Sequence, residues 1–308
     1  MRSNRRIITV LLCSAMLSCS TGCTATQVRD RAYLQAIELR TPENPEIQFH
    51  DFHAKKAVSF SSGKTISEAI ENAAVPLGKN LFLGHLELIA SADPVYGTQL
   101  NQLMRDYRLS PSCKVIGLSD GTVLTETDTS DLIWQIRQAE QLGKLPETDL
   151  FTILREWDSA SGTALLPITD THAFSAVIAA KDKIVTSLSE DAVEGLCWLR
   201  GNNYPEQIIT SDGETYVVTS AKTQLSAEEK QGRICVTITI RLHGNGDCTA
   251  AAKEIQRVCQ TAIQETITEY HADVFDLEAC LWSQCYDFMV QYDWNSAAEL
   301  LDFSVKFP

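Results

Sequence analysis

The stretch RICVTITIRL, residues 233–242, alternates strictly between apolar and polar side chains. Its aliphatic residues stand at every second position, at Ile234, Val236, Ile238, Ile240 and Leu242. Since successive side chains of a strand point to opposite faces of its sheet, this stretch predicts a strand with one buried face. It decides the fold class, because neighbouring segments have to cover that apolar face.

The segments after this strand can cover its apolar face. Residues 248–270 have one apolar face at helical spacing and predict a long helix. That face is made of Ile255, Val258, Cys259, Ala262, Ile263 and Ile267. A second helix is predicted by Leu277, Leu281, Cys285 and Phe288, and a final strand by Leu301, Phe303, Val305 and Phe307. We therefore expect a C-terminal β-β-α-α-β domain whose last strand pairs beneath the long helix.

Upstream of residue 206, strands and helices are mixed. Strands are expected at 36–39, 81–89 with a break at Gly84-His85, and 113–118; helices are expected at 99–107, 132–139 and 150–157. Thr65 and Glu68 form a capping box for a further helix that Pro76 stops. A hairpin of residues 173–179 and 184–188 precedes a helix that Ser189 caps and Gly201 ends. The fold class is thus α+β, with mixed and antiparallel sheets packed with helices in two to three domains.

The N-terminus has the pattern of an export signal. Arg2, Arg5 and Arg6 precede an uncharged, mostly apolar run, 7–17, which is too short to span a bilayer. Small residues then precede Cys23, as in bacterial lipoprotein signals, so residues 1–22 are predicted to be removed and Cys23 to be lipidated. The alternative is an ordinary secretory cleavage nearby. We expect a tethered extracytoplasmic protein, with an N-terminal region of two subdomains at 23–205 and a C-terminal domain at 206–308, divided at the polar stretch 201–205.

Composition limits the classes of partner. The chain has 308 residues, 44% of them hydrophobic, which is enough to bury a real core in two or three domains. Its net charge is −14, and loss of the signal arginines makes it more acidic. This charge excludes the electrostatic footprint of a nucleic-acid binder. An anionic membrane surface would repel the chain, so attachment has to come from a lipid or a partner.

The cysteines and histidines show no recognisable metal motif. Seven cysteines remain after Cys23, and none of them forms a CxxC pair. Buried free thiols fit as well as disulfide bridges. The segment His50-Asp51-Phe52-His53 brings two imidazoles near a carboxylate, but a third ligand is missing and a solvated loop is favoured.

The main alternative function is an exported enzyme of unrecognised type, and its sequence motifs are absent. The chain contains no HExxH, GxSxG, GxxxxGKS/T or GxGxxG. Glu265 and Glu269, one turn apart beside His271, are typical of a solvated helix face. A solute-binding lipoprotein is the other alternative, but it would need strands and helices that alternate repeatedly in two lobes. The antiparallel pattern at the C-terminus argues against it.

The order of several short blocks resembles the C-subunit lipoproteins of spore germination receptors, the GerC-type family. The blocks are Cys23 with Asp30-Arg31, Gly63-Lys64-Thr65, 84–89, 103–106, the hairpin and helix of 174–201, and 273–277. The most specific is VEGLCWLRG, 193–201, which is similar to the family's Gly-Leu-x-Trp-Leu-x-Gly. Departures are Thr24, where an aromatic residue is usual, Glu278, where glycine is usual, and a chain shorter than most members. They indicate a divergent or shortened member.

The resemblance implies a non-enzymatic subunit on the outer face of the spore inner membrane, without a cofactor. It implies two partners, a transporter-like multi-span receptor subunit and a second large membrane subunit. Nutrient recognition in the family is usually assigned to the transporter-like partner, so no ligand pocket is expected here. For Trp198 and for the Arg105-Asp106 pair, the expected roles are structural, as a core residue and as a helix end.

Overall fold

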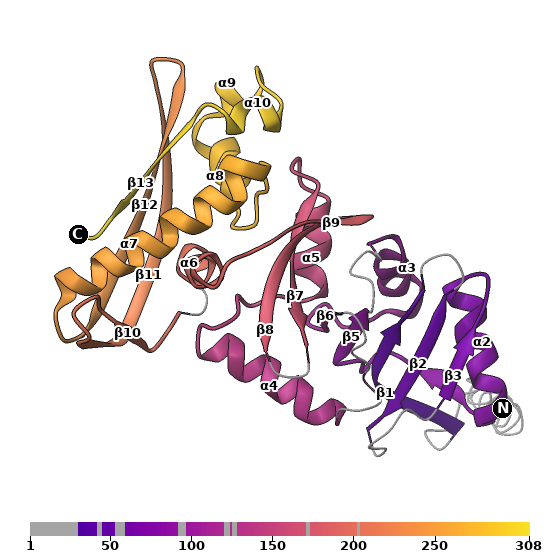
Figure 1. The fold of residues 1–308 in the computed structure, drawn as a ribbon. Coiled ribbons are helices and arrows are strands. Elements are labelled where there is room, and N and C mark those ends of the chain that lie inside the picture. The colour runs from indigo at the N-terminus through magenta and orange to yellow at the C-terminus, as the bar shows by residue number, and fades with distance from the viewer. Residues whose placement is uncertain are drawn as a thin grey trace, which may run out of the picture.

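The computed structural model describes residues 30–41, 45–52, 59–91, 97–119, 124, 128–170, 173–201 and 204–308. Within these ranges the chain forms two sheets, of nine and four strands, that pack against helices (Figure 1). The α+β class with mixed sheets that the sequence predicts is confirmed. Among the residues described, no helix has both the length and the apolar character needed to cross a bilayer.

The N-terminal sheet has the order β3-β2-β1-β5-β6-β7-β8-β9, with β4 paired to β1. The strands are β1 (Arg31–Leu39), β2 (Glu46–Asp51), β3 (Ser59–Ser62), β4 (Asn80–Phe82), β5 (Leu88–Ser91), β6 (Lys114–Leu118), β7 (Thr163–Thr169), β8 (Phe174–Ala180) and β9 (Lys183–Ser187). The central pairs β1/β5, β5/β6 and β6/β7 are parallel, and the outer pairs are antiparallel. Only Ile168 and Thr169 of β7 pair with β6, so two smaller sheets meet at a short seam.

Helices cover both faces of this sheet. They are α2 (Ile66–Leu77), α3 (Gly97–Tyr107), α4 (Thr129–Gln141) and α5 (Leu150–Trp157). Helices α2, α3 and α5 share one core with the strands, whereas α4 shares the other, through side chains such as Ile133 and Ile136. This two-sided cover explains why the central parallel strands β1, β5 and β6 are almost entirely buried.

Two expectations for this region were wrong in detail. Helix α2 runs through Pro76 and ends at Gly78, whose left-handed φ of 59° turns the chain. Strand β7 was not predicted, because Pro167 interrupts its apolar pattern. The proline is tolerated because at that position β7 pairs with β8 alone.

The C-terminal sheet has the order β10-β11-β12-β13. Its strands are β10 (Gln207–Ile209), β11 (Thr215–Lys230), β12 (Arg233–Asn245) and β13 (Leu301–Lys306). Strand β12 buries Ile234, Val236, Ile238 and Ile240, as its alternation predicts. The last strand pairs with β12, as expected, in parallel orientation. Helix α7 (Cys248–Ile263) follows β12 and buries the predicted apolar face against this core.

The helices after β12 are less regular than their spacing suggests. Helix α7 continues into a π-helical segment, η3 (Gln264–Thr268), where the Thr266 hydroxyl donates to the Ala262 carbonyl at 2.7 Å and competes with the backbone ladder. The second predicted helix is broken at Cys285 into α8 (Leu277–Gln284) and α9 (Tyr286–Met289). A short α10 (Trp294–Ala298) leads into β13.

Helix α6 (Glu190–Arg200) lies between the two sheets (Figure 1). Its buried side chains belong to one core cluster with Leu165 and Ile178 of the N-terminal sheet and with α7 and the C-terminal sheet. The stretch 201–205, where a boundary is expected, joins α6 to β10. An element that precedes this stretch therefore packs against elements that follow it.

Candidate functional site

The site begins with α6, whose ends are fixed by local sequence signals. The Ser189 hydroxyl accepts from the Ala192 amide at 3.2 Å, and Gly201 ends the helix with a φ of 68°. Glu265 accepts from both the amide and the hydroxyl of Ser189, at 2.9 and 2.7 Å. The expectation that Glu265 belongs to a merely solvated helix face is therefore wrong, because its carboxylate ties η3 to the start of α6.

Helices α6 and α7 meet at Gly195. A Cβ atom added to this glycine would lie 2.1 Å from the Val258 carbonyl oxygen and 2.8 Å from the Ala262 Cβ. The helices can approach this closely only because Gly195 has no side chain. This explains physically why the VEGLCWLRG block has glycine at its third position.

Trp198 is fully buried, which confirms its expected role in the core. Its ring stacks on Tyr204 at a centroid distance of 5.4 Å, and its backbone carbonyl accepts from the Thr223 hydroxyl at 2.6 Å. The indole Nε1 has no hydrogen-bond partner among the described residues. Trp198 therefore joins α6 to β11 by a hydrogen bond of its backbone, while its ring packs on Tyr204.

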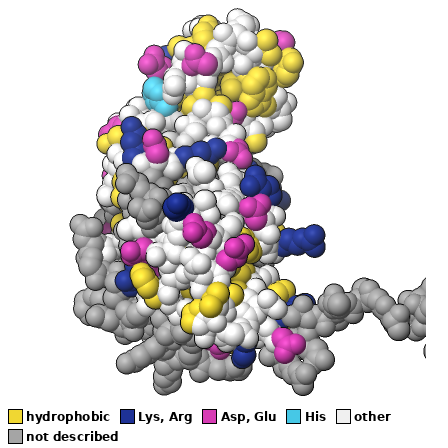
Figure 2. All heavy atoms as spheres, turned by 90° about the vertical axis from the view of Figure 1, so that its right-hand side faces the viewer, with side chains coloured by type: hydrophobic (Ala, Val, Ile, Leu, Met, Phe, Trp, Pro, Cys, Tyr) yellow, Lys and Arg dark blue, Asp and Glu magenta, His cyan; other side chains and the backbone are white. Residues whose placement is uncertain are grey.

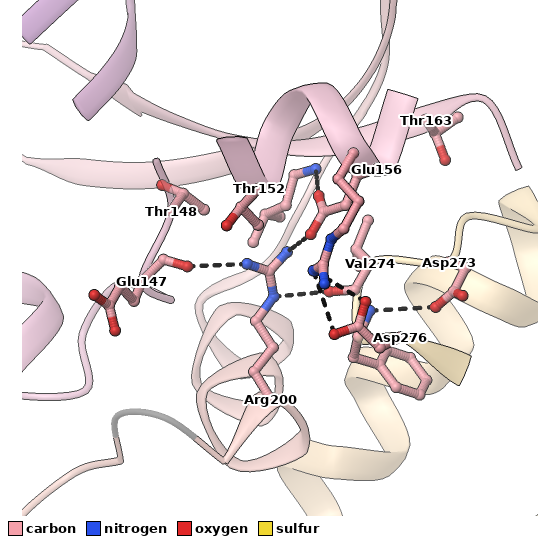
Figure 3. A network of polar contacts seen from close by, with 12 residues as sticks. Glu147, Thr148, Thr152, Glu156, Thr163, Arg200, Asp273, Val274 and Asp276 are labelled. Carbon is pink, nitrogen blue, oxygen red and sulfur yellow. Dashed lines mark hydrogen bonds and ion pairs between the residues drawn. The ribbon is translucent and has the colours of Figure 1, made fainter. Parts of the chain in front are cut away.

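Arg200, at the end of α6, joins three segments at a junction between the two sheets (Figure 3). Its guanidinium donates to Glu156 of α5 at 2.6 Å, to the Val274 carbonyl at 2.7 Å and to the Glu147 carbonyl at 3.0 Å. The side chains of Arg200 and Glu156 are only 8% and 6% exposed. Glu156 also accepts from the Leu165 amide of β7 at 2.9 Å. The planar guanidinium suits this task because it presents several donors in fixed directions.

The segment 273–276 completes the junction. The buried Asp273 carboxylate accepts from the amides of Phe275, Leu277 and Glu278 at 3.3, 2.9 and 2.6 Å, which fixes the start of α8. Asp276 has a φ of 62° and pairs with Arg155 of α5 at 3.0 Å. This second arginine–carboxylate contact between the two parts of the chain is more exposed than the Arg200–Glu156 pair.

Burial controls the electrostatics of the junction. It raises the pKa of Glu156 to about 7, against the opposing effects of Arg200 and the Leu165 amide. Burial also raises the pKa of Asp273, which its three amide donors oppose. All three carboxylates of the junction are engaged by donors of the chain itself, an arrangement that suits a structural joint better than proton transfer.

Other residues singled out from the sequence lie elsewhere. Cys23 is outside the described residues, so its lipidation stays a prediction. Arg105 and Asp106 form an exposed ion pair at 2.8 Å near the end of α3. His50 is buried in β2, where its Nδ1 lies 3.1 Å from the Thr129 hydroxyl. Burial, and secondarily Arg40, lowers the pKa of His50 to about 4.

Metal and disulfide chemistry find no support in the described ranges. His53 lies outside them, and they contain no cluster of three metal-ligating side chains. The cysteines at 113, 197, 235, 248, 259, 280 and 285 are all free thiols. Burial raises the pKa of Cys113, Cys197 and Cys259, so these three are packing residues in the thiol form.

Sequence reasoning missed Glu156 as the partner of Arg200. A signal was present, since Glu156 interrupts an apolar helix face formed by Ile153, Leu154 and Trp157. A charged residue on a buried helix face needs a partner of opposite charge. The identity of that partner depends on contacts 44 residues away along the chain.

Comparison with known proteins agrees with the family resemblance of the sequence blocks, two of which form this junction. Residues 26–171 match the family model described as the spore germination protein N-terminal domain, and residues 175–307 match the model described as spore germination B3/GerAC like, C-terminal. A comparison with curated proteins gave no significant match. A solved structure titled "Crystal Structure of the GerBC protein" shares the fold, with a TM-score of 0.56 and 15% identity over 86% of this chain and 92% of that one. The chain therefore belongs to the GerC-type family of spore germination receptor subunits.

Proposed function

We propose that the chain is the membrane-anchored, non-enzymatic C subunit of a nutrient germinant receptor. The observation that carries this proposal is the junction at Arg200, where the block 193–201 meets the block 273–277. These two blocks contribute to the resemblance to the family, and here they hold the two sheets together. The chain thus builds a structural joint from two of the family's blocks, despite its departures at Thr24 and Glu278.

Glu278 is itself accommodated in this joint. Its backbone amide donates to Asp273, and its carboxylate accepts from the Ala160 amide at 2.9 Å and from the Trp282 indole at 3.2 Å. A glycine could supply only the first of these contacts. The departure therefore adds a link between the N-terminal sheet and α8, which supports a working subunit.

The anchor of this subunit is a lipid on Cys23, which follows removal of residues 1–22. A lipid anchor suits a chain with a charge of −14, because an anionic bilayer repels such a protein. Two or more acyl chains, such as palmitate, hold a protein stably where one chain does not. The subunit then lies on the extracytoplasmic face of the spore inner membrane, beside a transporter-like multi-span subunit and a second large membrane subunit.

The experiment uses a spore former in which this chain is the only C subunit. Cys23→Ala is compared with Cys19→Ala, a matched change within the signal. Labelled palmitate is expected to enter the wild type and the Cys19 variant, but not the Cys23 variant. Nutrient germination is expected to fall only in the Cys23 variant, while germination by non-nutrient agents continues in all three strains.

Two results would contradict the proposal. Normal nutrient germination in spores that lack the whole chain would exclude the receptor role. Turnover of an ester, peptide, glycoside or phosphate by the purified protein, abolished by one side-chain substitution, would favour the enzyme alternative. If labelled palmitate still entered the Cys23→Ala protein, only the assignment of the lipid anchor to Cys23 would be wrong.

A further inference from the structure

Helices α8 and α9 carry two apolar stripes, of which only one is needed for the core. The inner stripe, Leu281, Cys285 and Phe288, is buried. The outer stripe consists of Trp282, Tyr286 and Val290, which are 41%, 62% and 61% exposed. We call these three residues the aromatic strip. Single exposed apolar side chains are normal, but several that lie close together mark an interaction surface.

The aromatic strip is continuous with a groove between the two parts of the chain. The Trp282 and Tyr286 rings lie 5.8 Å apart, and Trp282 also lines a groove of about 640 Å³. The opposite wall consists of Met104 of α3 with Phe151 and Leu154 of α5. Phe151 is 51% exposed, although its apolar neighbours Leu150 and Leu154 in α5 are buried. Apolar side chains of both sheets' helices thus face one hollow.

Most charges around this surface are negative. From residue 258 to residue 305 the sequence contains nine Asp and Glu residues and no Lys or Arg. Asp287 and Glu299 are exposed in this segment. Asp276 and Glu278 line the groove together with Arg155, whose charge is paired with that of Asp276. In Figure 2, yellow side chains gather at the upper end of the molecule, the end that carries α8, α9 and α10 in Figure 1. The surface is therefore apolar in its centre and acidic around it.

We propose that the aromatic strip and the groove together bind a basic amphipathic segment of a partner protein. The apolar side chains of that segment cover Trp282 and Tyr286, and its Lys or Arg residues face the acidic surroundings. A second copy of this chain would bring the same acidic surface and be repelled, and so would an anionic bilayer. The inference rests on the proposed function, since it assigns the surface to contact with another receptor subunit.

The test places a photo-cross-linking amino acid at position 286 of the full chain, in spores that carry the complete receptor. Position 134 on α4 is the matched control, because Trp134 is an equally exposed aromatic residue at 63%. After irradiation, mass spectrometry identifies the attached peptide. From position 286 we expect one segment that is rich in Lys or Arg and has apolar residues at helical spacing. Position 134 is expected not to yield that segment.

The effects of charge and of apolar packing on the yield of the cross-linked product (adduct) from position 286 are then tested separately. Asp287→Lys with Glu299→Lys is expected to lower its yield at least about tenfold, whereas Asp131→Lys with Asp182→Lys, which changes the charge equally elsewhere, is expected to leave it unchanged. Trp282→Ala is expected to lower it by a similar factor and Trp134→Ala not to.

The inference is overturned if position 286 attaches to lipid, to a second copy of this chain, to a segment without basic residues, or to nothing. It is also overturned if the two charge variants behave alike. Such results leave the proposed function standing as long as nutrient germination still depends on the chain. Loss of that dependence would instead remove the receptor role.

Discussion

Gly195→Ala is the sharpest test of how α6 is held. In most helices this change stabilises the protein, because alanine is favoured over glycine by about 1 kcal/mol. Here the added Cβ would lie 2.1 Å from the Val258 carbonyl oxygen, against an ordinary contact distance of 3.4 Å or more. The two helices would have to separate by roughly 1 Å, since backbone and Cβ atoms have no rotamer to move to, and overpacking of this kind costs about 1–3 kcal/mol or more.

At Gly195 the steric cost should exceed the gain in helix propensity. If it reaches about 3 kcal/mol, the helix gain of about 1 kcal/mol leaves a net loss of about 2 kcal/mol. For a chain of this size that corresponds to a fall in Tm of roughly 3 °C. The assay is thermal and urea unfolding of the purified protein, followed by circular dichroism.

Gly97→Ala, at the start of α3, is the matched control for this measurement. The added Cβ there would lie 3.1 Å from the Lys181 Cγ and 3.2 Å from its Cα and Cβ. We expect at most a small change, because a shift of a few tenths of an ångström relieves these contacts. If Gly195→Ala were as stable as the wild type, the close contact between α6 and α7 would not be what requires glycine in this block.

Three further predictions concern the junction and the last strand. Arg200→Met should cost about 3–5 kcal/mol in urea unfolding, because it leaves three acceptors of the junction, two of them backbone carbonyls, without their donor. Arg233→Met, which breaks the exposed pair with Asp302, should change stability little; equal effects would contradict the importance of burial. The pKa of Glu156 is raised from 4.5 to about 7. Its contribution to the free energy of unfolding is therefore fully present below about pH 4.5 and is lost as the pH rises through about 7. The stability difference between the wild type and Glu156→Gln should therefore fall by about 3 kcal/mol over this range, and a constant difference would exclude the titration. Deletion of residues 300–308 removes β13 with the buried Leu301 and Val305, which should lower the free energy of unfolding by about 3–6 kcal/mol. Nutrient germination should therefore fall while non-nutrient germination persists. An unchanged melting curve would contradict the pairing of β13 with β12.

Local patterns predicted the elements whose signals are complete within one segment. Strand β12 has strict alternation, and α6 has both its serine cap and its terminal glycine. A strand ahead of β12 was expected in the β-β-α-α-β order, but its residues were not placed, because most side chains of β11 are exposed and few of them are strongly apolar. The break at Cys285 was also missed, because the apolar spacing 277, 281, 285, 288 continues across it.

Local sequence patterns could not predict the contacts of the junction, for a different reason. Arg200 and Val274 lie 74 residues apart, and Arg200 and Glu147 lie 53 residues apart. Two of the three acceptors of Arg200 are backbone carbonyls, which leave no mark on the amino-acid sequence. Motif order identified the family because the blocks are specific in sequence, but only the folded chain shows that two of them touch.

The position of α6 has a consequence for engineering hybrid subunits from two relatives. An exchange of halves at 201–205 would place an α6 from one parent on the α7 of another, so that Gly195 and Val258 no longer come from the same parent. It would also separate Arg200 from its acceptor at Val274. A crossover at residues 170–173, before β8, keeps both pairs within one parental sequence. The charged contacts left to match are then Arg200–Glu156, Arg155–Asp276 and Lys181–Asp158. Functional hybrids should therefore be found with crossovers ahead of β8, and should be rare with crossovers after α6.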